Sequence, residues 1–180
     1  MPDQELIDGL IASYRELNMK IRRLDPSQLG DIASRGDGSI TGILRQMRDR
    51  ELRASQAMRV MVLGEDAETD DEVASAQTDT LDQAADSPIF YLAQFGTARE
   101  ATLAMIREQP DEVWDREVGT PQGRMSVKAY VRTLVDRDRE RLQQIDELLV
   151  KAGAPEAARI AADAGQTPSP VDKDASEPVS

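Results

Sequence analysis

Four charged residues occupy positions where the surrounding sequence predicts a buried apolar side chain. In four stretches of the chain, apolar residues recur three and four apart, the spacing that places them on one face of a helix. Near the middle of three of these faces the sequence has charges instead: Glu51, Arg99, Asp138 and Arg141. An unpaired charge in a helical core costs on the order of several kcal/mol, so these groups must be paired, hydrated or bound to a ligand.

These charges have two interpretations. In the first, Glu51 and Asp138 neutralise Arg99 and Arg141 in a buried network of ion pairs. In the second, the charges line a polar pocket for a small anionic or zwitterionic molecule, because the cores of helical bundles commonly hold such pockets. The sequence alone leaves both open.

The remaining amphipathic stretch contributes polar groups at the same level. The midpoints of packed helices of equal length meet whichever way the helices run, and the first stretch has Ser13 and Tyr14 at its midpoint. Gly96 lies one turn before Arg99 and, lacking a side chain, would leave room beside it. We therefore expect a polar layer at mid-height of the bundle.

The chain contains no His and no Cys, which limits the chemistry of this layer. Thiolate zinc sites, iron–sulfur clusters, imidazole-bound metals and Ser-His relays all need one of these residues. We therefore expect no cofactor and no metal-dependent catalysis. Carboxylates can still transfer protons when their surroundings shift their pKa, so an enzymatic role stays open.

Four predicted helices would position these residues, and their ends have recognisable signals. Ser39 and Ser87-Pro88 are typical of helix starts, and Gly64 and Gly153 are typical of helix ends. Strand signals are nearly absent, since aromatic residues make up only 3% of the chain. Helices of roughly 20 residues, about 30 Å long, predict an all-α four-helix bundle. The apolar rows run through Ile7–Leu24, Ile40–Met61, Ile89–Ile106 and Val127–Leu148.

The segments outside these helices differ sharply in composition. Residues 65–86 include nine acidic residues and no basic one, which predicts a long acidic crossover between the second and third helices. From residue 153 the chain becomes rich in Ala, Pro and Ser, which predicts a mostly disordered C-terminal tail with a short helical piece near residues 156–163. We therefore expect one domain over residues 1–152 and a tail over residues 153–180.

The overall charge limits the classes of partner. With 34 acidic and 22 basic residues the net charge is −12, which repels nucleic acids and anionic membrane surfaces. No apolar run approaches the ~20 residues that a membrane helix needs. We therefore expect a cytoplasmic protein that binds neither nucleic acid nor membrane.

The second predicted helix is locally basic despite this balance. Its arginines could form an anion-binding strip, an acceptor for the acidic crossover or for a partner, or a solvated face. They are Arg45, Arg48, Arg50, Arg53 and Arg59.

Two motifs resemble those of the DinB-like four-helix-bundle family. Residues 38–51, GSITGILRQMRDRE, are similar to its second-helix motif, in which a histidine precedes a Leu-x-Asp-x-Glu pattern. Residues 137–145, RDRERLQQI, resemble its fourth-helix motif, usually His-x-x-x-His followed by Leu-x-Gln-Ile. Between them, residues 114–116 and 123–127 resemble the connection into the fourth helix, and the likeness spans about residues 4–150.

The resemblance implies a metal site whose ligands are replaced in this chain. Members of that family typically hold a divalent metal through three histidines, and the matching positions here are Gln46, Arg137 and Arg141. An amide is a weak neutral ligand, and a guanidinium group is a permanent cation without a lone pair to donate. We therefore hypothesise that Arg137 and Arg141 supply the positive charge that the metal supplies in the family. Their counter-ions would be Asp49, Glu51 and Asp138.

The predicted function is that of a metal-free module that binds a small ligand or a partner protein. Some members of the resembled family are thiol-dependent transferases or isomerases, which is the alternative function, and relatives commonly pair, so we expect a homodimer. The candidate pocket residues are Tyr14, Gln46, Glu51, Arg99, Arg137, Asp138 and Arg141.

Overall fold

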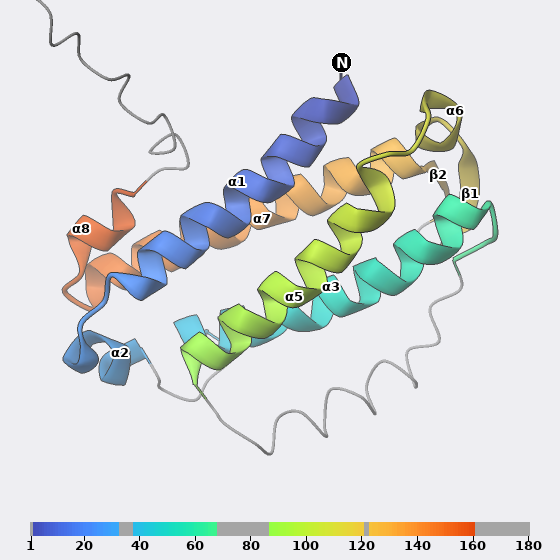
Figure 1. The fold of residues 1–180 in the computed structure, drawn as a ribbon. Helices are drawn as coiled ribbons and strands as arrows, with labels where there is room; N and C mark the ends of the chain where they lie inside the picture. The colour runs from blue at the N-terminus through green and yellow to red at the C-terminus, as the bar shows by residue number, and fades with distance from the viewer. Residues whose placement is uncertain (1, 33–37, 68–86, 121–122, 161–180) are drawn as a thin grey trace, which may run out of the picture.

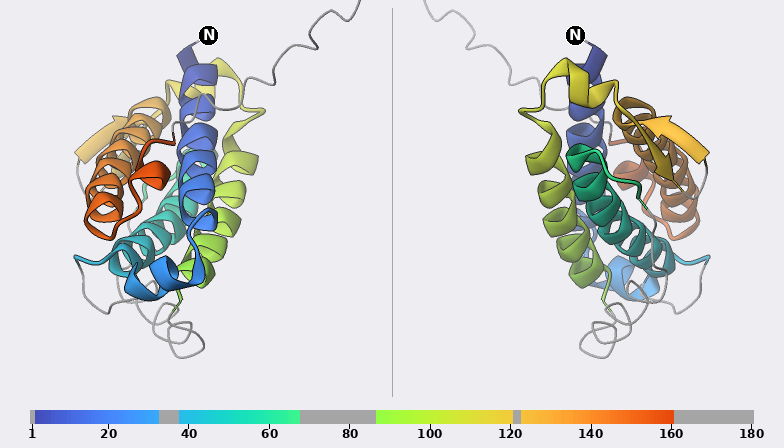
Figure 2. Two further views of the ribbon diagram at one scale, coloured as in Figure 1. Left: turned by 90° about the vertical axis from the view of Figure 1, so that its left-hand side faces the viewer. Right: turned by 90° about the vertical axis from the view of Figure 1, so that its right-hand side faces the viewer.

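Four long helices lie side by side and enclose the core (Figure 1). The computed structural model describes residues 2–32, 38–67, 87–120 and 123–160, and most of them are helical. Helix α1 packs against α7, and α3 packs against α5, while α1 also contacts α5 and α3 contacts α7. Two views at right angles show the same arrangement (Figure 2). The long helices are α1 (Pro2–Arg22), α3 (Ile40–Leu63), α5 (Pro88–Ile106) and α7 (Val127–Lys151).

The ends of α3 and α7 follow the signals in the sequence. The Ser39 hydroxyl oxygen accepts a hydrogen bond of 3.0 Å from the Gly42 N–H, which satisfies one of the free amide groups at the start of α3. The chain leaves α3 at Gly64, whose φ of 84° is a conformation that glycine adopts without strain. Ser126, which the sequence analysis did not select, caps α7 in the same way, accepting from the Ala129 N–H at 3.1 Å.

A small antiparallel strand pair precedes α7, where the sequence predicts only a connecting loop. The strands are β1 (Glu117–Thr120) and β2 (Gly123–Ser126), with Val118 opposite Met125. The prediction is wrong here because strands of four residues are too short to show an alternating pattern, and a tertiary contact holds this pair in place. The Gly119 N–H donates to the Asp66 carboxylate at 2.7 Å, and the Gly119 carbonyl accepts from the Ala67 N–H at 2.9 Å.

The core consists of two apolar clusters, and each long helix passes from one to the other. In α1 and α7 the cluster that contains Trp114 comes first along the chain, whereas in α3 and α5 it comes second. Helices α1 and α7 therefore run in one direction, and α3 and α5 run in the other. Between the two clusters each long helix has a buried polar residue, namely Ser13, Glu51, Arg99 or Asp138. The predicted polar layer is present at this level.

Three short helices complete the described part of the chain: α2 (Pro26–Ile32), α6 (Asp111–Trp114) and α8 (Pro155–Ala158). The Lys20 ammonium, buried between helices, donates to Asp146 at 2.5 Å and to the Ala158 carbonyl at 3.0 Å. The hydrogen bond to the Ala158 carbonyl holds α8 against α1, and Ala154 and Ala157 are part of the apolar core. Helix α8 overlaps the short helical piece that the sequence analysis expects near residues 156–163.

The rest of the predicted crossover and tail, residues 68–86 and 161–180, lies outside the described residues. In the described part of the chain, no helix is both long enough and apolar enough to span a membrane.

Candidate functional site

The polar layer is centred on Arg99, whose side chain is only 1% exposed. Its guanidinium group donates to the Glu51 carboxylate at 2.9 Å and to the Asp138 carboxylate at 2.8 Å. Both acceptors are themselves buried, at 3% and 7% exposure. Three long helices therefore meet through one cation shared by two anions.

Neighbouring polar groups add further hydrogen bonds to this triad, while the buried Nε–H of Arg99 has no hydrogen-bond partner in the described part of the chain. The Thr102 hydroxyl donates to the second oxygen of Glu51 at 2.7 Å, and the Ser13 hydroxyl donates to Asp138 at 2.6 Å. The Arg99 guanidinium group also donates to the Leu10 carbonyl at 3.0 Å. All four long helices thus contribute to one network, as a buried charge requires.

The electrostatics of the triad keep Arg99 charged. Burial alone would lower the pKa of Arg99, because it removes water from the guanidinium group. The negative charges of Asp138 and Glu51 and the hydrogen bonds to them outweigh burial and raise that pKa above its ordinary value. The group also lies over the Phe95 ring, with its central carbon 4.7 Å from the ring centre.

The hypothesis that Arg137 and Arg141 pair with the core carboxylates is wrong, because Arg99 holds that position. Arg137 is exposed, and the half-buried Arg141 donates to Gln144 at 2.7 Å, three residues further along α7. Successive helical positions differ by about 100° in direction. When Asp138 points inward to Arg99, residues 137 and 141 consequently lie beside that face. The third expected counter-ion, Asp49, instead accepts from Arg48 at 2.6 Å.

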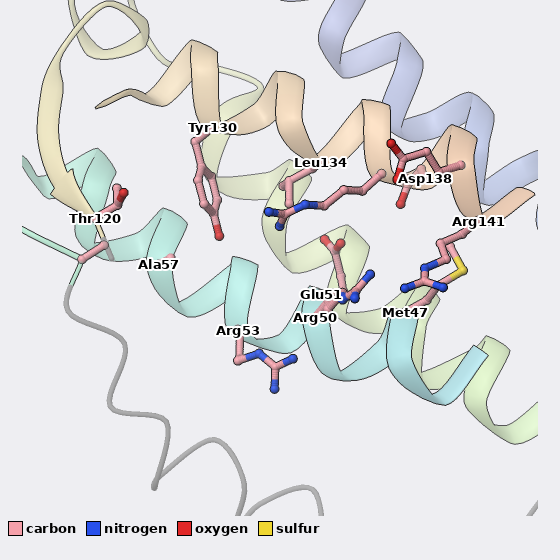
Figure 3. A pocket seen from close by; sticks show the side chains of 13 residues that line it. Met47, Arg50, Glu51, Arg53, Ala57, Thr120, Tyr130, Leu134, Asp138 and Arg141 are labelled. Atoms are coloured by element: carbon pink, nitrogen blue, oxygen red, sulfur yellow. The ribbon is translucent and has the colours of Figure 1, made fainter. Parts of the chain in front are cut away.

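A cavity of about 470 Å³ opens between α3 and α7 on the outer side of this triad (Figure 3). Glu51 and Asp138 line it from within, so that these two carboxylates of the triad form its floor. Tyr130 extends from α7 toward α3, and its hydroxyl points into the space between the two helices. The lining includes four arginines, Arg50, Arg53, Arg137 and Arg141, together with Glu140 and a less polar group of Met47, Ala57, Ala67, Thr120, Tyr130 and Leu134.

Four of the seven predicted site residues line this cavity, namely Glu51, Arg137, Asp138 and Arg141. Arg99 lies behind the two carboxylates rather than in the lining. Gln46 is half-buried on α3 and is not part of the lining.

Tyr14, the seventh predicted site residue, lies outside the cavity and packs between α1 and α5. Its ring contacts the Phe95 ring edge to face at 5.9 Å, and it covers Gly96, where an added Cβ would lie 2.3 Å from the Tyr14 hydroxyl oxygen. The room that Gly96 leaves is therefore filled by Tyr14 and not by a ligand.

Five of the lining residues that the sequence analysis did not select lie on two helical rows. Arg50, Arg53 and Ala57 are spaced three and four apart on α3, next to the row of Glu51. Tyr130 and Leu134 lie on the corresponding row of α7, together with the predicted site residues Arg137 and Arg141. The basic strip on the second predicted helix was a signal for Arg50 and Arg53, but only two of its five members line the cavity.

The cavity is strongly cationic. In the described part of the chain, none of its four arginines makes an ion pair with a carboxylate. Burial, and then the charges of Arg141, Arg137 and Arg53, lower the pKa of Arg50, while Glu140 acts in the opposite direction. After burial, the causes that lower this pKa are like charges, so the neighbouring cations repel Arg50.

Tyr130 adds a neutral donor to this lining. Burial and then the negative charge of Glu51 raise the pKa of its hydroxyl above the ordinary value of about 10, against the opposing charges of Arg137 and Arg53. The hydroxyl therefore keeps its proton at neutral pH and can donate a hydrogen bond into the cavity.

The arrangement suits anions rather than metal ions. Among the described residues, no three acidic side chains are grouped so that they could hold a metal. Guanidinium groups offer several N–H donors in a planar fork, the geometry that binds carboxylate and phosphate oxygens.

Comparisons of the chain with protein-family models, with curated proteins and with solved structures give no match. The resemblance to the DinB-like family therefore stays a prediction.

Proposed function

We propose that this protein is a metal-free module that binds a small anionic molecule in the cavity between α3 and α7. The observation that carries the proposal is the set of four arginines that line the cavity without a carboxylate partner in the described chain. Like charges held together in a folded protein are unfavourable unless something compensates them. A bound anion would provide that compensation.

The chain's own carboxylates leave this positive charge in excess. Glu51 and Asp138 are already bonded to Arg99, and Glu140 is exposed at the edge of the cavity. The four lining arginines and Arg99 outnumber these three carboxylates by two, so the site has a net charge of about +2 in a chain whose net charge is −12. A local charge opposite to that of the whole molecule favours a specific anion site over a general property of the surface.

The likeness to DinB-like proteins extends the proposal to the scaffold. In this interpretation the long helices are a DinB-like four-helix bundle, and arginines line the space that a metal occupies in that family. Two of the three replaced ligand positions, Arg137 and Arg141, line the cavity, which supports the interpretation. A cytoplasmic location and a homodimer, both expected from the sequence, are part of the same proposal.

Calorimetric titration with small anions at constant ionic strength tests the binding function. A panel of carboxylates, sulfate and phosphate should include at least one saturable ligand, and Arg50→Gln and Arg137→Gln should each weaken it by about tenfold. Arg59→Gln and Arg132→Gln are matched controls, because these exposed arginines lie on the same two helices but do not line the cavity. Equal losses in lining and control variants, or no saturable ligand at all, would overturn the proposal.

A further inference from the structure

We propose that the ligand is a phosphomonoester, with its phosphoryl group between Arg50 and Arg141 and its organic part toward Tyr130. This inference rests on the proposed function and specifies the class of its ligand. It follows from the two sides from which the arginines reach the cavity, from the net charge of the site and from the cavity volume.

The arginines approach the cavity from two sides. Arg50 and Arg53 come from α3, and Arg137 and Arg141 come from the facing helix α7. A carboxylate is planar and presents its two oxygens to one guanidinium fork. A phosphoryl group has three terminal oxygens that point in different directions, so it can accept hydrogen bonds from both helices at once. A cation set divided between two facing helices therefore favours a tetrahedral anion.

The charge of the site matches a phosphomonoester. Such a group carries about −1.5 to −2 charges at pH 7. The four lining arginines and Arg99 behind them exceed the three lining carboxylates by two. A monocarboxylate would neutralise only about half of this excess.

The cavity is larger than a phosphate ion requires. Its volume of about 470 Å³ falls within the range of roughly 300–1,000 Å³ that is typical of small-molecule sites. A water molecule takes about 30 Å³ of liquid, so an ion of five heavy atoms would leave most of the space to solvent. The phosphoryl group should therefore belong to a larger organic molecule.

The two ends of the cavity differ in character. Arg141 and Met47 lie at one end, and Tyr130, Ala57 and Thr120 lie at the other (Figure 3). The second end offers an aromatic face, small aliphatic surfaces and a protonated hydroxyl. An apolar or aromatic body with a hydrogen-bond acceptor near the Tyr130 hydroxyl would fit this end.

Calorimetric titration with three probes at pH 7.5 and constant ionic strength tests the inference. The probes are phenyl phosphate, inorganic phosphate and benzoate. We expect phenyl phosphate to bind at least about tenfold more tightly than benzoate, because the phosphoryl group accepts additional charge-assisted hydrogen bonds. It should also bind about tenfold more tightly than inorganic phosphate, because only the ester covers the Tyr130 end.

Two variants assign the ends of the ligand. Arg141→Gln should weaken phenyl phosphate by about tenfold and reduce its advantage over benzoate. Tyr130→Ala should weaken phenyl phosphate, because it removes the aromatic face against which the phenyl ring would pack, and should leave inorganic phosphate unchanged. Arg132→Gln, on the exposed side of α7, is the matched control for Arg141→Gln, and circular dichroism checks that each variant is folded.

The outcomes separate this inference from the function on which it rests. Benzoate binding as tightly as phenyl phosphate, with both lost in Arg141→Gln, would leave the anion site in place and overturn the phosphomonoester. Inorganic phosphate binding as tightly as the ester would overturn the role of the Tyr130 end. If none of the three probes and no other anion shows saturable binding, both proposals are overturned.

Discussion

At Arg99, a guanidinium group buried to 1% exposure donates to carboxylates from two other helices. Removing charges from water is expensive, and the attraction among them offsets that cost only with good geometry and additional hydrogen bonds. Thr102 and Ser13 supply the additional donors that the two carboxylates need. The three charges are therefore interdependent, and losing one partner should cost more than losing the whole network.

Replacing Arg99 with Met should destabilise the protein by about 3–5 kcal/mol, because Glu51 and Asp138 would stay buried without a counter-ion. Equilibrium unfolding in urea measures this loss. Combining Arg99→Met with Glu51→Gln and Asp138→Asn should recover part of it, since the amides remove the unpaired charges. A loss below about 1 kcal/mol for Arg99→Met alone would mean that water reaches the two carboxylates.

The opposite result is expected at Arg141, which the sequence had suggested as a core cation. Its hydrogen bond joins Gln144 on the exposed side of α7, and it has no carboxylate partner among the described residues. Arg141→Leu should therefore change the free energy of unfolding by no more than about 0.5 kcal/mol. Thermal unfolding of this variant and of Arg132→Leu, its exposed control on the same helix, checks the prediction. A loss of about 3 kcal/mol would restore Arg141 to the buried network.

At the scale of the helices, the sequence predicts most of the fold from local signals. The cap at Ser39, the end at Gly64 and the apolar rows belong to single helices, so they can be recognised without knowledge of their neighbours. The level of the polar layer is also predictable, because it lies at the helix midpoints. The strand pair is not predictable from these signals, since the contact of Gly119 with Asp66 joins residues more than fifty positions apart.

Which arginine pairs with the core carboxylates also depends on contacts between helices, and the local signals of one helix do not reveal these contacts. Periodicity places Arg99, Arg137 and Arg141 near the right height, but the rotation of each helix about its axis decides which side chain reaches Glu51. That rotation follows from packing of the whole core, as the contact between Tyr14 and Gly96 illustrates. The sequence therefore predicts the correct level of the polar layer. It does not fix the rotation of the helices, so it assigns Arg137 and Arg141 to the core carboxylates in place of Arg99.

The close approach of α1 and α5 at Gly96 gives a prediction at this scale. A methyl group there would lie 2.3 Å from the Tyr14 hydroxyl oxygen, so Gly96→Ala should destabilise the protein by about 1–3 kcal/mol. The effect should be smaller when Tyr14 is also replaced by Ala, because the clash is then removed. A double-mutant cycle by urea unfolding measures this coupling, and additive effects of the two changes would contradict the proposed contact.

At the scale of the whole molecule, the cationic cavity lies in a strongly acidic chain. The net charge of −12 repels an anionic ligand at a distance, whereas the arginines attract it within the cavity. Salt screens the first effect over about 8–10 Å at physiological ionic strength but acts less on groups that are partly buried. Recognition should therefore depend on short-range contacts with the arginines, and rapid electrostatic capture from solution is not expected.

Arg50→Gln tests whether the cavity is organised for a ligand at the expense of the stability of the free protein. Burial and three neighbouring arginines lower the pKa of Arg50, so the folded state holds this proton less tightly than the unfolded chain does. Linkage then gives the sign: at neutral pH, where the group is charged in both states, its charge lowers the stability of the folded protein. The neutral variant should therefore have a higher melting temperature than the parent at low salt, and the difference should shrink as salt screens the repulsion.

With a saturating anion the order should reverse, because a ligand at 100 times its Kd stabilises the parent by about 2.7 kcal/mol and the weakened variant by less. Arg59→Gln, an exposed change on the same helix outside the cavity, should show neither effect. If Arg50→Gln is less stable than the parent without an anion, the four arginines serve folding, and the argument for a ligand loses its physical basis.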